Sequence, residues 1–428
     1  MNLIQHNRRQ GLINQYINLP KKIYILFLVR MTNIMGSSFV IAFLPLFLSE
    51  KMGISASSIS KYVVGMSSAF IFGSVIGGKM ADRIGRKRTL IISSLCSAVA
   101  YLISGFLCEY SFVIIIIFVG FLFCQTVSPA ISAMAVDVTD RTNRQVSISL
   151  IYQGANVGFA IGPLLAGFLF NKHLEWIFWG QAGVILCGVL LIALFIDDTM
   201  LVKDTDIISN DKCCISQTNN ASFLQSLRSP LILGFIICVV MMYFAFSMTT
   251  YILPLQMKDV FGINDGIIYY GFSCSLNGVG IVLGSPILIY LTKNYPSLRN
   301  LLIATMLYFV GYGFYSIVKP LALFYILTLI WTSGEVIANT NIEVFLSTHS
   351  GNLHRAKFQS INGICMGIGR CTGPLLIGVF LIDNTIRAAW VLIAVVCLIA
   401  GIGFIFLRRM EIQQEKLKQQ KKNESDVT

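Results

Sequence analysis

The stretch LPLFLSEKMGI (residues 44–54) recurs in the second half of the chain as LPLQMKDVFGI (253–263), 209 residues later. In both copies a Leu-Pro-Leu run precedes an acidic residue, Glu50 or Asp259, and then a Gly-Ile pair. Two glycine patterns repeat at nearly the same distance: Gly73-x3-Gly77 with Gly280-x3-Gly284, and Gly162-Pro163-x3-Gly167 with Gly373-Pro374-x3-Gly378. This order predicts a chain built from two related halves.

The composition around these repeats is that of a membrane protein. Of 428 residues, 55% are hydrophobic and only 12% are charged, whereas soluble domains have roughly 25% charged residues. A spanning helix needs about 20 mainly apolar residues. The apolar segments predict twelve such helices, near 22–48, 60–80, 89–108, 112–136, 146–170, 176–196, 230–257, 266–291, 300–318, 321–346, 357–382 and 387–407. We therefore expect an all-α membrane protein with twelve transmembrane helices in two pseudo-symmetric six-helix bundles.

The repeat and the polar segments give the domain organisation. We predict an N-terminal tail (1–21), a first bundle (22–196), a linker (197–229), a second bundle (230–407) and a basic tail (408–428). Two six-helix halves of this kind favour a secondary transporter and not an enzyme.

The net charge of +12 is distributed unevenly along the chain. With both termini placed in the cytoplasm, 23 of the 32 Lys and Arg residues lie on that side. Six lie on the other side: Lys51, Lys61, Lys172, Lys258, Lys319 and Arg387. This bias predicts a multi-pass protein of the cell membrane with cytoplasmic termini. The basic ends indicate contact with anionic lipid headgroups, not with nucleic acid.

No segment predicts a metal or a cofactor. The four histidines show no metal-ligand spacing, and most cysteines lie inside apolar helices, where free cysteine packs as a small apolar residue. The stretch GSVIGGKM (73–80) is close to a phosphate-binding loop, but Met80 replaces the hydroxyl residue and no strand precedes it. We therefore expect no ATPase subunit. The expected partners are a small-molecule substrate, protons and the lipid bilayer, and the protein is expected to be a monomer.

Glu335 lies in the middle of the apolar helix 321–346, in WTSGEVIANTNIEVF (331–345). A carboxylate at this depth costs about 3 kcal/mol on insertion scales, so it normally lines a cavity, pairs or carries a proton. Arg30 lies at similar depth in the first helix. Glu335 therefore binds a proton or a cationic substrate, forms a static pair with Arg30, or has no role.

Polar residues at helical spacing accompany this carboxylate. We predict a proton or substrate site from Glu335, Arg30, Asn339, Gln125, Asn33 and Arg370. Helix 230–257 carries a weaker stripe of Tyr243, Ser247 and Thr250, for which packing and a cavity are equally favoured. Arg370 either binds backbone carbonyls or contacts substrate, and Glu343, near the cytoplasmic end, is expected to be solvated.

The loop GGKMADRIGRKRTL (77–90) carries the most specific motif in the chain. It resembles the signature of the major facilitator superfamily, Gly-x3-Asp-Arg-x-Gly-Arg-Arg/Lys, which Gly78, Asp82, Arg83, Gly85, Arg86 and Lys87 match. In that family the cluster latches the two halves together in the outward-facing state, and Asp137 resembles its second acidic partner. An acidic residue at this position can also accept bonds from a helix N-terminus. A basic loop without a latch is the alternative.

The stretch GANVGFAIGPLLAG (154–167) favours export as the direction of transport. It resembles the helix-five motif of the superfamily's drug:proton antiporters through Gly154, Gly158, Gly162, Pro163 and Gly167, but departs from it at Ala166, where a glycine pair is usual. Glycines at every fourth residue form a groove for a neighbouring helix, and a helix-packing face is the alternative.

These features together predict a proton-coupled bacterial exporter of small amphipathic compounds or drugs. A proton-linked importer or uniporter of a polar metabolite such as a sugar is the second hypothesis. A receptor or assembly factor with a transporter-like body is the third, and the latch, the repeat and the buried charges argue against it.

Overall fold

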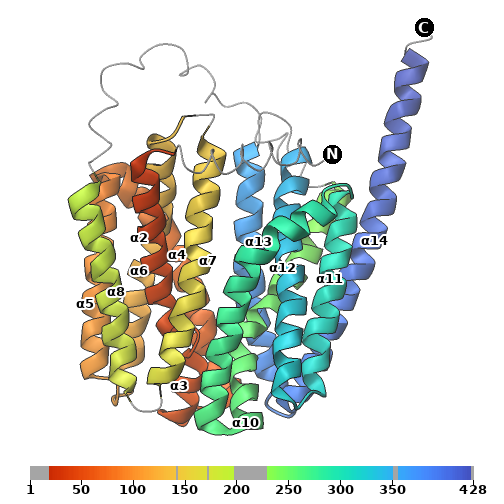
Figure 1. Ribbon diagram of the computed structural model, residues 1–428. Helices are drawn as coiled ribbons and strands as arrows, with labels where there is room; N and C mark the ends of the chain where they lie inside the picture. The colour runs from red at the N-terminus through yellow and green to blue at the C-terminus, as the bar shows by residue number, and fades with distance from the viewer. Residues whose placement is uncertain (1–18, 141–142, 171–172, 197–228, 350–354, 426–428) are drawn as a thin grey trace, which may run out of the picture. The chain divides into compact units, whose positions relative to one another are not determined.

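The computed structural model describes residues 19–140, 143–170, 173–196, 229–349 and 355–425. Nearly all of the predicted linker and most of the N-terminal tail lie outside these residues. All regular structure in the described ranges is helical (Figure 1). In the first half the helices are α2 (Lys21–Ile41), α3 (Leu44–Glu50), α4 (Ala56–Ile84), α5 (Arg86–Phe106), α6 (Val113–Asp137), α7 (Arg144–Leu169) and α8 (Leu174–Phe195).

The second half begins with α10 (Pro230–Thr292), a run of 63 residues that contains two of the predicted helices. Gly262 breaks it with a φ of 82° and a ψ of 168°, a backbone conformation that residues with a side chain rarely adopt. The remaining elements are α11 (Ser297–Gly313), the short 3₁₀ helix η2 (Phe314–Ser316), α12 (Leu321–His349), α13 (Arg355–Phe380) and α14 (Ile386–Ser425).

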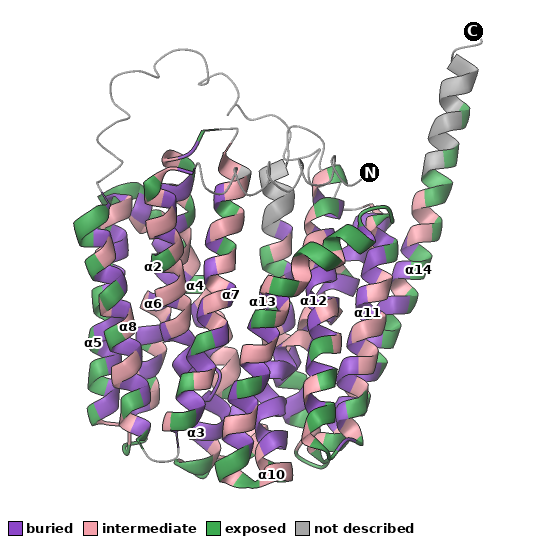
Figure 2. Cartoon of the chain, viewed as in Figure 1, coloured by how far each residue is buried: buried purple, intermediate pink, exposed green. Residues whose placement is uncertain are grey.

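The helices have the length and composition of membrane spans. Ten described helical stretches are long and apolar enough to cross a bilayer, with α2 and α3 forming one of them. One of these stretches, α10, contains two of the predicted helices. A further predicted helix is α11, which has 17 residues and is not among the ten. All twelve predicted segments are therefore helical. Exposed positions recur along these helices (green in Figure 2). Among the exposed residues are large apolar ones such as Phe72 (60%) and Leu283 (67%). Such surface suits lipid, and the protein is an all-α, multi-pass membrane protein.

The chain divides into two compact units. Unit 1 comprises Met1–Ile208 and Leu253–Val282, and unit 2 comprises Ser209–Ile252 and Leu283–Thr428. The middle of α10 thus belongs to unit 1, because it packs on helices of the first half. The predicted division of the chain at 197–229 follows the repeat and stays a prediction.

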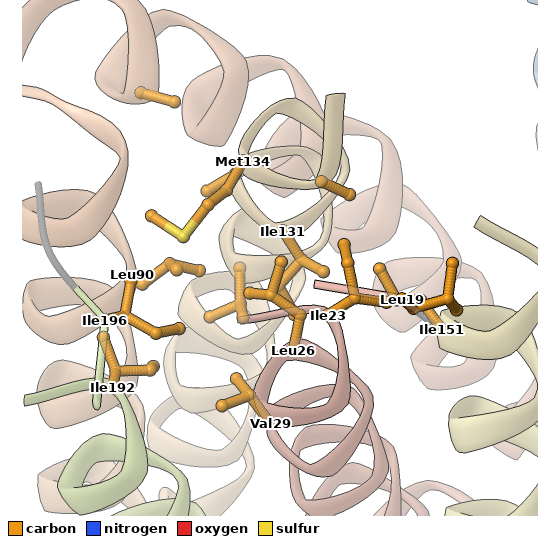
Figure 3. Close-up of a cluster of buried hydrophobic side chains, with 14 residues drawn as sticks. Leu19, Ile23, Leu26, Val29, Leu90, Ile131, Met134, Ile151, Ile192 and Ile196 are labelled. Carbon is orange, nitrogen blue, oxygen red and sulfur yellow. The ribbon is translucent and has the colours of Figure 1, made fainter. Parts of the chain in front are cut away.

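A cluster of buried aliphatic side chains forms part of the core of unit 1 (Figure 3). Leu26 and Val29 of α2, Leu90 of α5, Ile131 of α6 and Ile192 of α8 meet in it, and each is at most 2% exposed. Removing apolar surface from water stabilises a fold by roughly 25 cal/mol per Å². The cluster positions α2, which carries Arg30 and Asn33.

The repeat also appears in how the helices pack. In unit 1, Gly158 of α7 lies against the backbone carbonyl of Met31 of α2. In unit 2, Gly369 of α13 lies against the carbonyl of Val240 of α10. Met31 and Val240 are 209 residues apart, which is the offset of the LPLFLSEKMGI repeat. The two halves therefore use the same glycine contact at equivalent positions.

The two copies of the LPL repeat end in the same backbone conformation. Gly53 has a φ of 63° and Gly262 a φ of 82°. Within unit 1 the two copies also touch: Lys258 forms an ion pair with Glu50, and its Nζ donates to Ser49 Oγ at 3.1 Å. Ser49 and Lys258 are themselves repeat equivalents, 209 residues apart. This contact therefore joins equivalent positions of the two copies of the repeat.

Candidate functional site

The predicted latch loop folds as a tight junction between α4 and α5. Gly85 joins them with a φ of 96°, which favours glycine. Arg86 then pairs with Asp137 at the end of α6, with Arg86 Nη1 2.7 Å from Asp137 Oδ2. The two side chains are only 15% and 8% exposed, so this is a partly buried, charge-assisted contact. It ties the start of α5 to the end of α6.

The other latch residues have more open surroundings. Asp82 and Arg83 are exposed. Lys87 donates from Nζ to the carbonyl of Ala193 in α8 at 3.3 Å. Gly78 has open space where a side chain would stand, whereas its neighbour Gly77 lies against the backbone of Thr126. Within this loop, Gly77 is thus the glycine that packs against α6, and Arg86 and Asp137 form the ion pair.

The glycines of the helix-five motif line the contact of α7 with α2, which run side by side in Figure 1. A methyl group on Gly154 would stand 2.7 Å from the carbonyl oxygen of Phe27. One on Gly162 would stand 2.6 Å from that of Met35. These approaches leave no room for a side chain, so glycine is required for α2 to lie this close.

The end of the same motif meets the middle of α10. A methyl group on Gly167 would stand 3.3 Å from the carbonyl of Ile267, and one on Gly271 would stand 2.8 Å from that of Pro163. Pro163 lies inside α7, where its missing N–H removes one helical hydrogen bond. The motif therefore contacts α2 over most of its length and α10 at its end.

In unit 1 the predicted polar residues of α2 and α6 lie together. Asn33 is 6% exposed and donates from Nδ2 to Cys124 Sγ at 3.3 Å. The charge of Arg30, which is half-buried, also acts on Cys124. Gln125 is 7% exposed and packs against Gly73 of α4. Cys124, which sequence reasoning took as apolar filler, accepts the hydrogen bond of Asn33 and so joins α6 to α2.

In unit 2, Glu335 and Arg370 lie within electrostatic range of each other. Glu335 is 8% exposed on α12, and its charge acts on Arg370 of α13. The guanidinium carbon of Arg370 lies 5.6 Å from the ring centroid of Phe246, within the range of a cation–π contact. Asn339 is half-buried one helical turn beyond Glu335. The predicted Arg30–Glu335 pair stays a prediction, and Arg370 is the cation that unit 2 itself supplies.

Aromatic rings lie near both of these residues. Trp331, one turn before Glu335, has its ring centroid 6.3 Å from that of Phe246 and 5.8 Å from that of Tyr312. Tyr312 of α11 is also within electrostatic range of Glu335. Arg370 therefore has an aromatic ring within cation–π range, and Glu335 has aromatic side chains within electrostatic range and one turn away.

A second polar group lies beside Arg370. The hydroxyl of Tyr243 in α10 donates to Asn362 Oδ1 of α13 at 2.9 Å, and Asn362 Nδ2 donates to Glu343 Oε1 of α12 at 2.8 Å. Glu343 was expected to be solvated, but it is half-buried and bonded because α13 passes beside α12. Sequence reasoning missed Asn362, although it precedes Arg370 by eight residues and so shares its helical face.

Comparison with known proteins agrees with this architecture. Residues 26–374 match the sequence model of the Major Facilitator Superfamily. An uncharacterized MFS-type transporter of Bacillus subtilis, YttB, is 22% identical over 404 residues, covering 93% of this chain and 98% of the relative. Multidrug resistance protein MdtG of Salmonella paratyphi C is 25% identical over 378 residues, covering 85% and 88%.

A solved structure shares the fold at lower identity. The nucleoside transporter NupG superimposes with a TM-score of 0.73 at 12% identity, covering 91% of this chain and 99% of that chain. At that identity the likeness concerns the fold alone. The family match spans most of the chain, and the repeated helix packing and the Arg86–Asp137 loop fit it, so the chain belongs to the Major Facilitator Superfamily of transporters.

Proposed function

We propose that this transporter exports small amphipathic compounds in exchange for protons, by alternating access. The observation that carries the proposal is the buried Glu335 of α12, within electrostatic range of Arg370, one turn from Trp331, which packs near the rings of Phe246 and Tyr312. The multidrug resistance relatives support export. The aromatic setting supports substrates with flat apolar parts.

Glu335 provides the coupling in this proposal. Burial favours its protonated form, and the neighbouring guanidinium favours its ionised form. A conformational change that alters either factor changes how tightly the carboxylate holds a proton. Coupling requires such a difference, because a proton bound equally well in both conformations shifts nothing.

The predicted latch fits the same cycle. Arg86 and Asp137 hold the α4–α5 loop against α6, which positions Asp82 at the protein surface. Following the resemblance to the family motif, Asp82 engages the other half of the transporter in the outward-facing state. The Arg86–Asp137 pair is then the support that keeps Asp82 in place for this contact.

Transport into inverted membrane vesicles tests the function. The protein is expressed with both termini at the cytoplasmic face, as the charge bias predicts, and the vesicle lumen is acidified. We expect fluorescent cationic dyes to accumulate inside, an uncoupler to release them, and Glu335→Gln to abolish the accumulation. A panel of sugars and nucleosides is assayed alongside the dyes.

Gradient-independent equilibration of a sugar or nucleoside, with no dye accumulation, would replace the proposal with the uniporter hypothesis. Gradient-driven movement of a polar metabolite out of the vesicles would replace it with the importer hypothesis. Protease cleavage of a C-terminal tag in inverted but not in right-side-out vesicles verifies the orientation on which the assay depends.

A further inference from the structure

In unit 2, the ends of α12 and α14 meet just beyond the predicted spans. His349 is the last residue of α12, and its Nε2 lies 3.6 Å from Oε1 of Glu411 in α14. The two side chains are 27% and 15% exposed, so the contact is largely shielded. Glu411 also pairs with Arg408 of its own helix. From this contact α14 continues to Ser425, beyond the ends of α11 and α12 (Figure 1).

The plane of the His349 ring is fixed by a stack of aromatic rings. The imidazole lies on the ring of Phe345, with centroids 4.1 Å apart and an interplanar angle of 26°. Phe345 in turn stacks on Phe235 of α10 at 4.0 Å, and the ring of Phe235 lies 6.4 Å from that of Phe404 in α14. Because this stack fixes the plane of the imidazole, each of its two nitrogens has a defined set of neighbours.

The neighbours of Nδ1 require it to carry a hydrogen. His349 Nδ1 lies 3.0 Å from the carbonyl oxygen of Phe345 and 3.2 Å from Thr348 Oγ1. A carbonyl oxygen only accepts hydrogen bonds. The Thr348 hydroxyl has one hydrogen, which it donates to the carbonyls of Val344 and Phe345, so it presents lone pairs to the imidazole. Nδ1 is therefore the donor in both contacts.

Nε2 then depends on a second proton. A neutral imidazole has a single hydrogen, and with that hydrogen on Nδ1 the lone pair of Nε2 faces the Glu411 carboxylate. A proton on Nε2 converts this unfavourable approach into a charge-assisted contact between an imidazolium and a carboxylate. The arrangement of the two side chains is thus that of a doubly protonated His349.

We propose that His349 and Glu411 form a proton-dependent clamp. When the imidazole is doubly protonated, it holds the extension of α14 (residues 408–425) against the end of α12. When the imidazole is neutral, the clamp opens. Among the described residues, the charged groups at His349 are Glu411 and, bonded to Glu411, Arg408, while α10 presents the uncharged ring of Phe235 behind Phe345. The clamp is independent of the proposed export function.

The sign of the pH dependence follows from the partner of the second proton. That proton has a carboxylate beside it in the clamped arrangement and none after the extension has moved away. The clamp is therefore closed at acid pH and opens as the pH rises through the range in which imidazoles lose a proton. Arg408 stays bonded to Glu411 within α14, so its pairing does not hold α14 to α12. By the predicted orientation, acidification of the cytoplasm closes the clamp.

Double electron–electron resonance on the full-length protein in lipid nanodiscs tests the clamp. Spin labels at positions 294 and 416 are exposed and both lie in unit 2, so rocking of the two halves does not change the distance between them. Attachment through keto amino acids avoids the native cysteines. Between pH 5.5 and pH 8.5 we expect the ratio of extended to docked distances to rise about two- to fivefold, the range for a partly exposed ion pair.

Three variants separate the charge from the packing. His349→Ala should give the open distribution at both pH values, and so should Glu411→Gln, which removes the charge of the carboxylate but keeps its shape. His349→Lys, which keeps a cation across this range, should stay docked at pH 8.5. His173→Ala is the matched control: His173 lies 3.7 Å from Glu175 in unit 1, and its loss should leave the pH dependence of the extension unchanged.

The outcomes are distinct. A distance distribution of the unsubstituted protein that does not change with pH overturns the clamp. A pH dependence that persists in His349→Ala or in Glu411→Gln assigns the change to another group and overturns it as well, as does a His349→Lys protein that opens at pH 8.5. Thermal melting verifies folding, and Glu411→Gln carries the test if His349→Ala fails to fold.

Discussion

Glu335 and Arg370 lie within electrostatic range of each other inside unit 2, and we expect removal of one charge to have a structural and a functional consequence. Glu335→Gln leaves the guanidinium without its carboxylate, which typically costs about 3–5 kcal/mol for a buried pair. We expect a lower melting temperature in detergent and no uphill transport. The double variant Arg370→Gln with Glu335→Gln should recover most of the melting temperature without recovering transport.

This double variant distinguishes a proton carrier from a static pair. If the pair only holds α12 to α13, restoring stability also restores gradient-driven transport, and the coupling role is wrong. Proton release on substrate addition, measured in the same samples, gives the direct comparison with the wild type.

Replacement of Asp137 should affect both stability and transport. Its contact with Arg86 is 2.7 Å long and largely buried, and a hydrogen bond to a charged group contributes about 1.5–3 kcal/mol. Asp137→Asn should lower the free energy of unfolding by an amount in this range and slow transport. Lys87→Gln, which loses only an exposed 3.3 Å bond to Ala193, should change stability by less than about 0.5 kcal/mol. Equal melting temperatures for the two variants would contradict a structural latch at Arg86.

At the scale of helices, the contact between α2 and α7 depends on backbone atoms that cannot move aside. Gly158→Ala places a methyl group against the carbonyl of Met31 and 2.8 Å from the amide nitrogen of Met35. Overpacking of this kind typically costs about 1–3 kcal/mol, and α2 has to shift. We expect lower thermal stability and slower transport with normal membrane insertion.

The repeat provides a parallel test and a control for the same prediction. Gly369→Ala of α13 meets the backbone of Val240 and Phe244 and should be destabilising to a similar degree. Gly65→Ala of α4 has no atom within 4 Å of the new methyl group, so it should be neutral or stabilise by up to about 1 kcal/mol. If Gly158→Ala is as stable and as active in transport as Gly65→Ala, the close approach of α2 to α7 is wrong.

At the scale of the whole molecule, the ion pair of Lys258 with Glu50 joins the ends of the two repeats within unit 1. If the proposed alternating-access cycle separates the two repeat ends, the pair has to break in each cycle. A partly exposed pair contributes about 0.2–1 kcal/mol. Lys258→Gln should therefore raise the population of the separated state by up to about fivefold.

Spin labels at positions 51 and 265, which flank the pair on exposed segments, report the distance across this contact. Double electron–electron resonance should show a larger long-distance fraction for Lys258→Gln than for the unsubstituted pair. The charge exchange of Glu50→Lys with Lys258→Glu should restore the original distribution. An unchanged distribution in Lys258→Gln would show that this pair does not hold the two repeat ends together.

The fold was predictable from the sequence because a bilayer limits the choices of an apolar chain. Without water to bond the backbone, each apolar run of about 20 residues forms a helix, so the composition alone predicted an all-α protein with twelve segments. The repeat at an offset of 209 predicted two related halves, and the matching contacts of Gly158 and Gly369 follow from it. The resemblance of residues 77–90 to a family loop indicated the superfamily.

Only the tertiary structure decided which polar groups meet. The sequence placed Glu335 and Arg30 at similar depth and Arg370 inside another apolar helix, but depth along a helix does not determine which neighbour a helix faces. Packing of α12 against α13 put Asn362 beside Glu343 and brought Arg370 within electrostatic range of Glu335. In unit 1, the packing of α4 against α6 made Gly77, and not Gly78, the close contact with α6. Local pattern determines helices and their exposed or buried faces, whereas contacts between residues more than 100 positions apart, such as Tyr243 with Asn362, depend on how those faces pack.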